Sequence, residues 1–401
     1  MTNDERSENA TEALGPDAER QAEAQEYARI RRRLMFLDLG ISAVLTVVFL
    51  VTGASQAYKE LLIQAGLTSS WLLVPAYLGS LGLGLTVLFW PLSWYSSYVL
   101  PHRYGLSTQT PKGWWTDELK SLALGLGLGL PVAEVVYWFL RSQPEAWWLW
   151  VAGFMVLLSV VMGYLMPVVF VPIFYELTRL EDETLVARIK RLAERADVEV
   201  ADVYVIDLSS RTTAANAMVM GMGNTKRIAL GDTLYENYSP DEIEVMLAHE
   251  LAHQVHHDLE LGVIVQSTLM VGSLYLAKLF LDWGIDAFGF TGPGDVAAVP
   301  LLALATGLFS FVTMPLTNAY SRWRERRADR YALQVTDDAQ AFAKSMLRLA
   351  DQNLSDLHPP DWVVWLLYDH PPVLQRVERA VGEEEARRHL EKALASTDEA
   401  D

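Results

Sequence analysis

Long apolar runs alternate with polar segments along most of this 401-residue chain. A membrane-spanning helix needs about 20 predominantly apolar residues to cross the hydrocarbon core of a bilayer. Six runs are long enough or nearly so: residues 34–54, 71–93, 118–140, 148–172, 261–283 and 297–317. The stretch 92–100 could form a further short or interfacial helix. The pattern therefore predicts an α-helical polytopic membrane protein with six or seven spans.

The polar segments divide the chain into regions with different expected roles. Both ends are acidic and poor in aromatic residues, so we expect disordered tails there. The polar segments on either side of the last two spans have the mixed composition of a folded domain. In chain order we expect an N-terminal tail (1–33), membrane helices (34–173), a polar folded segment (174–260), two further spans (261–317), a second polar folded segment (318–381) and a C-terminal tail (382–401).

The segment 174–260 changes from a strand-like pattern to a helical one. Ser239 can cap a helix, Pro240 suits the first helical position, and Glu242 completes a capping box. The apolar residues that follow predict a helix over 240–257. This segment is therefore expected to form an α+β domain. Its predicted strands are Val200–Asp207, Ala215–Met220 and Arg227–Leu230.

Arginine residues cluster at two ends of the apolar runs and predict the topology. Lys and Arg are enriched in loops on the cytoplasmic side of a membrane. One cluster precedes the first span and the other follows the last, so the N-terminus and both polar folded segments are expected in the cytoplasm. The polar first 28 residues argue against a cleaved signal peptide. The clusters are Arg29, Arg31, Arg32 and Arg33, and Arg322, Arg324, Arg326, Arg327 and Arg330.

Composition narrows the classes of function. Hydrophobic residues make up 51% of the chain and it has 13 Trp, as expected for a membrane protein. The formal net charge of −18 argues against a nucleic-acid partner. The chain has no cysteine, which excludes disulfides and thiol chemistry.

Residues 249–253 read His-Glu-Leu-Ala-His and are the strongest chemical signal in the chain. Two histidines four residues apart lie on one face of a helix, so His249 and His253 can bind one metal ion. Glu250 is placed to take a proton from a metal-bound water. This is the HExxH pattern of a zinc hydrolase. A surface helix with incidental histidines is the alternative for the string alone.

A hydrolytic zinc site needs a third protein ligand and an open position. Helical spacing places Asn318, Arg322, Glu325 and Asp329 on one face, directly after the sixth run. Glu325 is the natural third ligand, and Asp329 can accept the free N–H of a ligating histidine. The alternative is a basic juxtamembrane helix with i,i+4 ion pairs. The expected topology favours the ligand interpretation because it places Glu325 and His253 on one side of the membrane.

Taken together, these motifs resemble the type I CAAX prenyl protease family of integral-membrane zinc endopeptidases. The resemblance covers roughly residues 71–381. It rests on HELAH at 249 and on Asn-x-x-Ser-Arg-x-x-Glu-x-x-Ala-Asp at 318–329. Three further stretches agree: Pro167 to Pro172, the segments Ser209–Asn216 and Lys226–Asp232, and His370-Pro-Pro with Arg376. The heat-shock membrane proteases share the zinc motifs, but they are shorter and have fewer spans.

The resemblance implies roles for residues that the pattern alone leaves open. His370 or Arg376 would stabilise the developing oxyanion, although His370-Pro-Pro could equally be a turn before a helix at 373–381. Asn216, Ala217 and Met218 would form an edge strand that pairs with an extended peptide, with a structural hairpin as the alternative. The membrane helices would enclose a large chamber. The long N-terminal tail and His256 and His257 depart from the family pattern, and we interpret both histidines as solvated rather than ligands.

The sequence thus predicts a membrane zinc endopeptidase with one Zn²⁺ per chain, acting on an extended peptide or protein substrate with or without a prenyl group. A quality-control protease of the heat-shock membrane type is the alternative within the same chemistry. A transporter or scaffold with structural zinc is a third hypothesis. It fits less well because two histidines and one glutamate leave a coordination position open.

Overall fold

The structure, a computed structural model, describes residues 18–221, 226–386 and 388–389. In this part of the chain six helices are long and apolar enough to cross a membrane, as the sequence predicts. The stretch 92–100 is not a separate span: it continues α4 through a π-helical turn at Tyr95–Val99 into α5. The membrane helices and their extensions are α2 (Ala18–Val51), α4 (Ser70–Trp94), α5 (Leu100–Arg103), α6 (Pro111–Ser142), α7 (Trp147–Leu165), α8 (Val171–Phe174), α12 (Asp258–Phe288) and α13 (Val299–Thr336).

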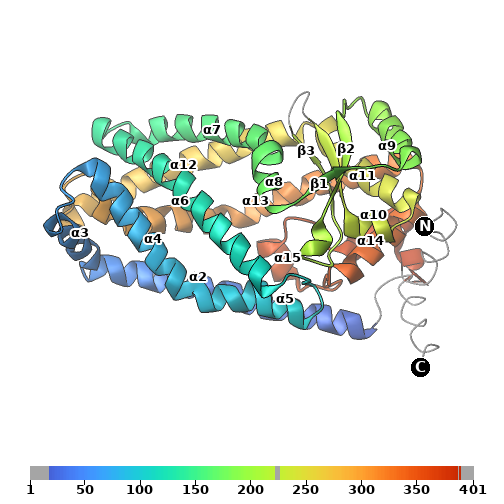
Figure 1. Ribbon diagram of the computed structural model, residues 1–401, viewed down its shortest axis with the longest axis horizontal. Coiled ribbons are helices and arrows are strands. Elements are labelled where there is room, and N and C mark those ends of the chain that lie inside the picture. The colour runs from blue at the N-terminus through green and yellow to red at the C-terminus, as the bar shows by residue number, and fades with distance from the viewer. Residues whose placement is uncertain (1–17, 222–225, 387, 390–401) are drawn as a thin grey trace.

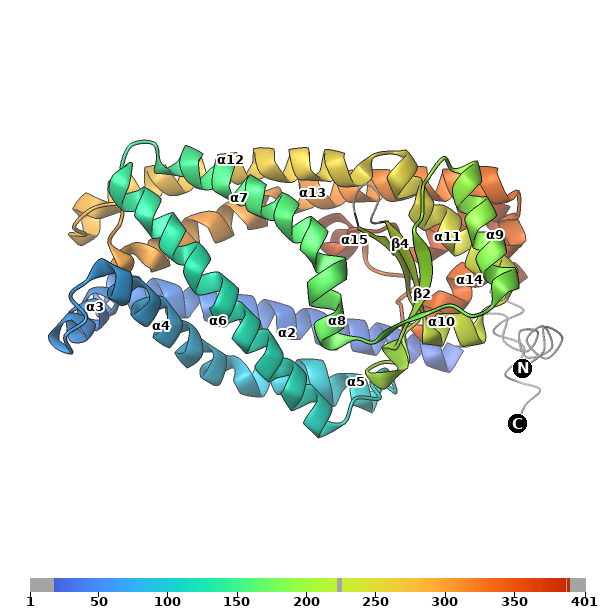
Figure 2. The same ribbon diagram turned by 45° about the horizontal axis from the view of Figure 1, so that its top comes forward.

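The long helices are arranged as a ring at one end of which sits the sheet-containing domain (Figures 1 and 2). Contacts run from α2 to α13, α12, α7, α6 and α4 in turn, and the short helix α3 (Ala54–Gln64) joins α4 back to α2. In the most apolar stretch of each of these helices, only 6–33% of the residues are buried. The ring order is compatible with the chamber implied by the resemblance, but the chamber itself stays a prediction.

The α2–α4, α6–α7 and α12–α13 connections meet at the end of the ring away from the sheet (Figure 1). Lys59 on α3 forms an ion pair with the buried Asp295, which precedes α13. Gly294 lies against Arg141 at the end of α6. These contacts place the three connections together at one end of the helical ring.

The domain beside the membrane helices is α+β. Its four-stranded sheet has the order β1-β2-β4-β3, in which β2 and β4 are parallel and the other pairs antiparallel. The three predicted strands are present, and β1 is an addition that the sequence pattern did not indicate. The strands are β1 (Leu177–Arg179), β2 (Asp202–Ile206), β3 (Ala217–Met220) and β4 (Arg227–Gly231); the helices are α9 (Glu183–Arg195), α10 (Asp232–Asn237), α11 (Pro240–Val255), α14 (Ala339–Gln352), α15 (Asp361–Leu367) and α16 (Val373–Val381).

Helix α11 carries the HELAH residues and begins as predicted. The Ser239 side chain accepts from the Glu242 backbone N–H, and the Glu242 carboxylate accepts from the Ser239 N–H at 2.8 Å. The helix ends at Val255, two residues before the predicted end, because His257 adopts a left-handed backbone conformation with φ 52°. The chain then turns into α12, so Asp258 lies close to the end of α11.

Part of each segment that was predicted to be a disordered tail is ordered. Residues 18–33, expected to be disordered, form the first half of α2, where Ala24 and Tyr27 are buried against Tyr104 and Leu354. At the other end, residues 383–386 are helical and Ala386 is buried in the domain core. A few apolar residues in an acidic segment are enough to pack it against the rest of the protein. The average composition of the segment does not reveal these residues. Residues 1–17 and 390–401 lie outside the described residues.

Candidate metal centre

His249, His253 and Glu325 come together where α11 packs against α13. One ligand atom from each lies within 4.8 Å of the others. The Nε2 atoms of His249 and His253 lie 3.1 Å and 3.5 Å from the two oxygens of Glu325. Ligands bound tetrahedrally to zinc at about 2.0–2.1 Å are about 3.3 Å apart, so these separations fit one zinc ion.

The first histidine is oriented by Asp329. The Nδ1 atom of His249 lies 2.9 Å from Oδ1 of Asp329, which leaves Nε2 toward Glu325. Burial lowers the pKa of His249, but hydrogen bonds to Asp329 and Glu325 outweigh burial and raise the pKa to about 9. Positive charge is therefore favoured where the metal would bind. The predicted position of Asp329 beside a ligating histidine agrees with this geometry.

Arg376 has a different partner from the one that the resemblance suggested. Its guanidinium is buried and donates two hydrogen bonds to Asp329, at 3.0 Å and 2.6 Å. The bidentate pair holds the carboxylate that orients His249. Because two of its donors are engaged with Asp329, we interpret Arg376 as a residue that positions this carboxylate. Its role as an oxyanion donor stays a prediction.

His253 is oriented by Asp258, which the sequence interpretation missed. The Asp258 carboxylate is fully buried, and its Oδ2 lies 2.8 Å from Nδ1 of His253. Its Oδ1 lies 3.4 Å from Nε of Arg324. An acidic residue five positions after the second histidine was the available signal. In a helix that continued to residue 257, Asp258 would lie away from the face that carries the two histidines. The left-handed conformation of His257 instead brings the Asp258 carboxylate to His253.

We predict that Asp258→Asn raises the dissociation constant for zinc about 10- to 100-fold, the usual cost of losing a partner behind a metal ligand. Competition with a fluorescent zinc chelator on the purified, monodisperse protein measures this change. The control is Asp286→Asn, an exposed position on the same helix α12, which should leave affinity unchanged. Equal affinities for the two variants would mean that His253 needs no carboxylate to orient it.

His370 lies at the open side of the cluster. Its Nε2 atom is 3.4 Å from Oε2 of Glu325, and about half of its side chain is exposed. A hydrogen bond from Nδ1 to Asp369 raises the pKa of His370, which favours a protonated ring that can donate. Of the two oxyanion candidates, the geometry therefore supports His370. Glu250, next to His249 on α11, is partly exposed.

Two polar residues of the third-ligand helix brace the segment that carries His370. The Asn318 amide donates to the Leu366 carbonyl at 2.7 Å. The Arg322 guanidinium donates to the carbonyls of Val364 and Tyr368. The sequence motif 318–329 thus supplies a candidate ligand at Glu325. One and two turns earlier it supplies two residues that hydrogen-bond to the segment around α15.

Strand β3 ends the strand order of the described sheet and contacts α11. Its Ala217 side chain is buried, and Met218 packs on the other face of the sheet. Asn216 precedes the strand; its backbone oxygen accepts from Gly231 at 2.8 Å and its side chain is exposed. Any contact of β3 with a peptide would therefore use the strand's main chain, as predicted, with the Asn216 amide free to add one polar contact.

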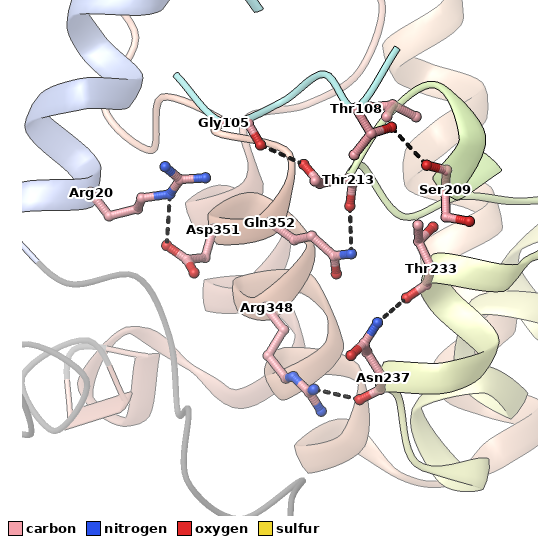
Figure 3. A pocket seen from close by; sticks show the side chains of 11 residues that line it. Arg20, Gly105, Thr108, Ser209, Thr213, Thr233, Asn237, Arg348, Asp351 and Gln352 are labelled. Carbon is pink, nitrogen blue, oxygen red and sulfur yellow. Dashed lines mark hydrogen bonds and ion pairs between the residues drawn. The ribbon is translucent and has the colours of Figure 1, made fainter. Parts of the chain in front are cut away.

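A separate polar pocket lies where α2, α10 and α14 meet (Figure 3). Its two arginines are already engaged: Arg348 with Glu242 and the Asn237 carbonyl, and Arg20 with Glu23. Gln352 donates to the Thr213 carbonyl at 2.7 Å. An ion pair between Nε of Arg20 and Oδ1 of Asp351, at 3.9 Å, joins the N-terminal helix to α14. None of the three candidate metal ligands lines this pocket.

Comparisons with known proteins cover almost the whole chain. Residues 10–176 match the family described as CAAX prenyl protease N-terminal, five membrane helices, and residues 179–384 match peptidase family M48. Four of the six candidate spans and the shorter α3 fall within the first match. Together with geometry that fits a metal, these matches agree with the resemblance read from the motifs.

Individual relatives agree with the family matches. An uncharacterized metalloprotease of Bacillus subtilis, YhfN, is 30% identical over 92% of this chain and 87% of its own length. CAAX prenyl protease 1 of Saccharomyces cerevisiae is 30% identical over 75% of this chain and 70% of its own. The crystal structure of Ste24p from S. mikatae has the same fold, with a TM-score of 0.83, 24% identity and 94% of each chain covered.

Proposed function

The chain belongs to peptidase family M48 as a multi-pass membrane metalloprotease, and on this premise we propose that it is a zinc endopeptidase that cleaves extended peptides at the cytoplasmic membrane face. The observation that carries the proposal is the set of three ligand atoms from His249, His253 and Glu325, spaced for one zinc ion. Membership of a peptidase family argues against the hypothesis of a transporter or scaffold with structural zinc.

The residues present fit zinc better than a harder cation. Two imidazoles and one carboxylate are a ligand set typical of catalytic zinc, and both Nδ1 atoms are bound to carboxylates, leaving Nε2 for the metal. When bound, zinc lowers the pKa of a coordinated water toward about 7 and polarises the carbonyl of the scissile bond.

The chain's own groups then move the proton and hold the charge. Glu250 takes a proton from the attacking water and passes it to the leaving amine. His370, whose pKa is raised by its hydrogen bond to Asp369, donates a hydrogen bond to the developing oxyanion. Asp329 and Asp258 keep the two imidazoles in the orientation that Nε2 coordination needs.

The substrate would lie along β3, which has no second partner strand in the described sheet and would offer main-chain hydrogen bonds with little side-chain selectivity. Relatives named CAAX prenyl protease 1 support a prenylated peptide as the substrate class. A role in membrane-protein quality control is the second candidate, since an edge strand accepts any extended chain. Arginine clusters flanking the first and last spans support a cytoplasmic location of the domain.

We predict that the purified protein in detergent cleaves an extended peptide, loses activity to a chelator and recovers it with Zn²⁺. Fluorogenic cleavage with and without metal measures this, and a zinc-free serine protease serves as the chelator control. Activity that survives complete metal removal, checked by metal analysis, would overturn the zinc mechanism. A matched peptide pair, with and without a prenylated cysteine, separates the substrate candidates: equal rates would favour quality control.

A further inference from the structure

Two arginines of α13 lie behind the carboxylate that orients the second candidate histidine. Oδ2 of Asp258 contacts Nδ1 of His253 at 2.8 Å, and Oδ1 of the same carboxylate faces α13. The nearest cation there is Arg324, whose Nε lies 3.4 Å from Oδ1, and Nη1 of Arg327 lies 4.0 Å from the same oxygen. Neither arginine is a candidate metal ligand or a candidate oxyanion donor, so their place beside Asp258 asks for another explanation.

The Asp258 carboxylate depends on nearby positive charge because its side chain is fully buried. A buried carboxylate is costly unless cations and hydrogen-bond donors compensate it. Oδ1 accepts no hydrogen bond from the described residues, and Nε of Arg324 is buried and donates none to them. A small closure of the 3.4 Å contact would satisfy both atoms at once.

The guanidinium of Arg324 is confined between two helices. On α12, a Cβ at Gly262 would lie 3.3 Å from Nη1 of Arg324, which is tighter than an ordinary contact. On α13, the guanidinium lies over the Tyr320 ring, 5.7 Å from its centroid. The Arg324 side chain is 22% exposed. A cation held in this way can fix the position of the carboxylate beside it.

The first candidate histidine has the same order of groups on different elements. Asp329 contacts Nδ1 of His249 at 2.9 Å, and Arg376 donates two hydrogen bonds to Asp329. Two arginine–carboxylate–histidine relays therefore end at the two Nε2 atoms that face Glu325. One relay takes its arginine from α16 and the other from α13.

We propose that Arg324 is a positioning residue of the metal centre, which acts on His253 through Asp258. Its guanidinium stabilises the buried carboxylate where this accepts from Nδ1 of His253, and that hydrogen bond keeps Nε2 directed toward Glu325. Arg327 adds positive charge from a greater distance. The inference rests on the proposed zinc centre, and it gives α13 a second function there besides supplying Glu325.

An ordinary ion pair between α12 and α13 is the competing explanation. Such a pair would stabilise the fold, and its loss would lower the melting temperature without changing the metal affinity of the folded protein. A positioning residue behaves differently: its loss weakens zinc binding, and only as long as Asp258 is present to transmit the effect. Zinc affinity therefore separates the two explanations.

Competition with a fluorescent zinc chelator on the purified, monodisperse protein tests the proposal. We expect Arg324→Gln to raise the dissociation constant for zinc at least about 10-fold, the lower end of the range for a residue behind a metal ligand. Arg324→Lys keeps the charge and should recover most of this loss. Arg330→Gln removes an exposed arginine from the same helix and should bind zinc as the wild type does.

Equal dissociation constants for the wild type and the Arg324→Gln variant would overturn the proposal. A lysine variant that binds zinc as weakly as the glutamine variant would contradict the role given to the positive charge of Arg324.

A double-mutant cycle shows whether Arg324 acts through Asp258. In the Asp258→Asn background the charge to be stabilised is gone, so Arg324→Gln should change the dissociation constant by less than about 2-fold. In the Asp329→Asn background the same substitution should keep its effect of at least about 10-fold, because Asp329 serves the other histidine. Equal effects of Arg324→Gln in both backgrounds and in the wild type would overturn the relay.

Cobalt(II) in place of zinc supplies a readout that overall stability does not move, because its visible absorption follows the geometry of the coordinating atoms. We expect Arg324→Gln to change this spectrum as Asp258→Asn does, and Arg330→Gln to keep the wild-type spectrum. A wild-type spectrum of Arg324→Gln at full cobalt occupancy, together with a lowered melting temperature, would assign Arg324 a purely structural role.

The metal-binding measurements also keep this inference separate from the proposed function. A wild type that cleaves no peptide, but whose zinc affinity responds to Arg324→Gln as expected, would support the relay and count against the peptidase function alone. A wild type that binds neither zinc nor cobalt would overturn the metal centre and the relay together.

Discussion

Glu250→Gln is expected to lower kcat for peptide cleavage by about 10²- to 10⁴-fold, the usual contribution of a general base. Glutamine keeps the size of the side chain but cannot take a proton from the attacking water. The metal ligands are untouched, because His249, His253 and Glu325 form the cluster without Glu250. Bound zinc should therefore stay at one per chain. Steady-state cleavage together with metal analysis of the same sample checks both statements.

Glu236→Gln is the matched control for this variant. Glu236 is an exposed glutamate on α10 in the same domain, so its loss should leave both kcat and zinc content unchanged. Full activity of the Glu250→Gln variant would contradict the assignment of Glu250 as the general base. Loss of zinc together with activity would show instead that Glu250 supports the metal centre.

The candidate metal ligands were predictable because each depends on local spacing. A capped helix fixes His249 and His253 on one face of α11, and Glu325 and Asp329 lie one turn apart on α13. The six long spans were predictable for the same reason, since helix length and hydrophobicity are local properties. The observed ends of α6 and α13 differ from the predicted ends of the spans, because both helices continue beyond the apolar run as polar helix.

Long-range contacts account for what the sequence did not indicate. Arg376 lies 47 positions from its partner Asp329, and no spacing rule joins two such residues. Asp258 reaches His253 only through the left-handed His257, a backbone conformation uncommon for residues other than glycine. The order of residues 18–33 depends on the docking of Tyr27 against Tyr104, which lies in another segment of the chain. Tertiary packing decided each of these points.

Glu325→Ala is expected to weaken zinc binding by more than about 100-fold, beyond the cost of losing a residue that only orients a ligand. Glu325 is the contact between the two histidines: its oxygens lie 3.1 Å and 3.5 Å from their Nε2 atoms. Without it, two imidazoles remain on one helix and nothing from α13 completes the site. Metal analysis after dialysis against a weak chelator should find almost no zinc, and cleavage should fall to background.

His257→Ala supplies the comparison that makes this result specific. His257 follows His253 by four residues, as His253 follows His249, yet its side chain is 77% exposed and turned away by the left-handed backbone. The variant should keep one zinc per chain and full activity. Stoichiometric zinc in Glu325→Ala would identify another residue as the third ligand. Loss of zinc in His257→Ala would place this histidine in the metal site, against the geometry described above.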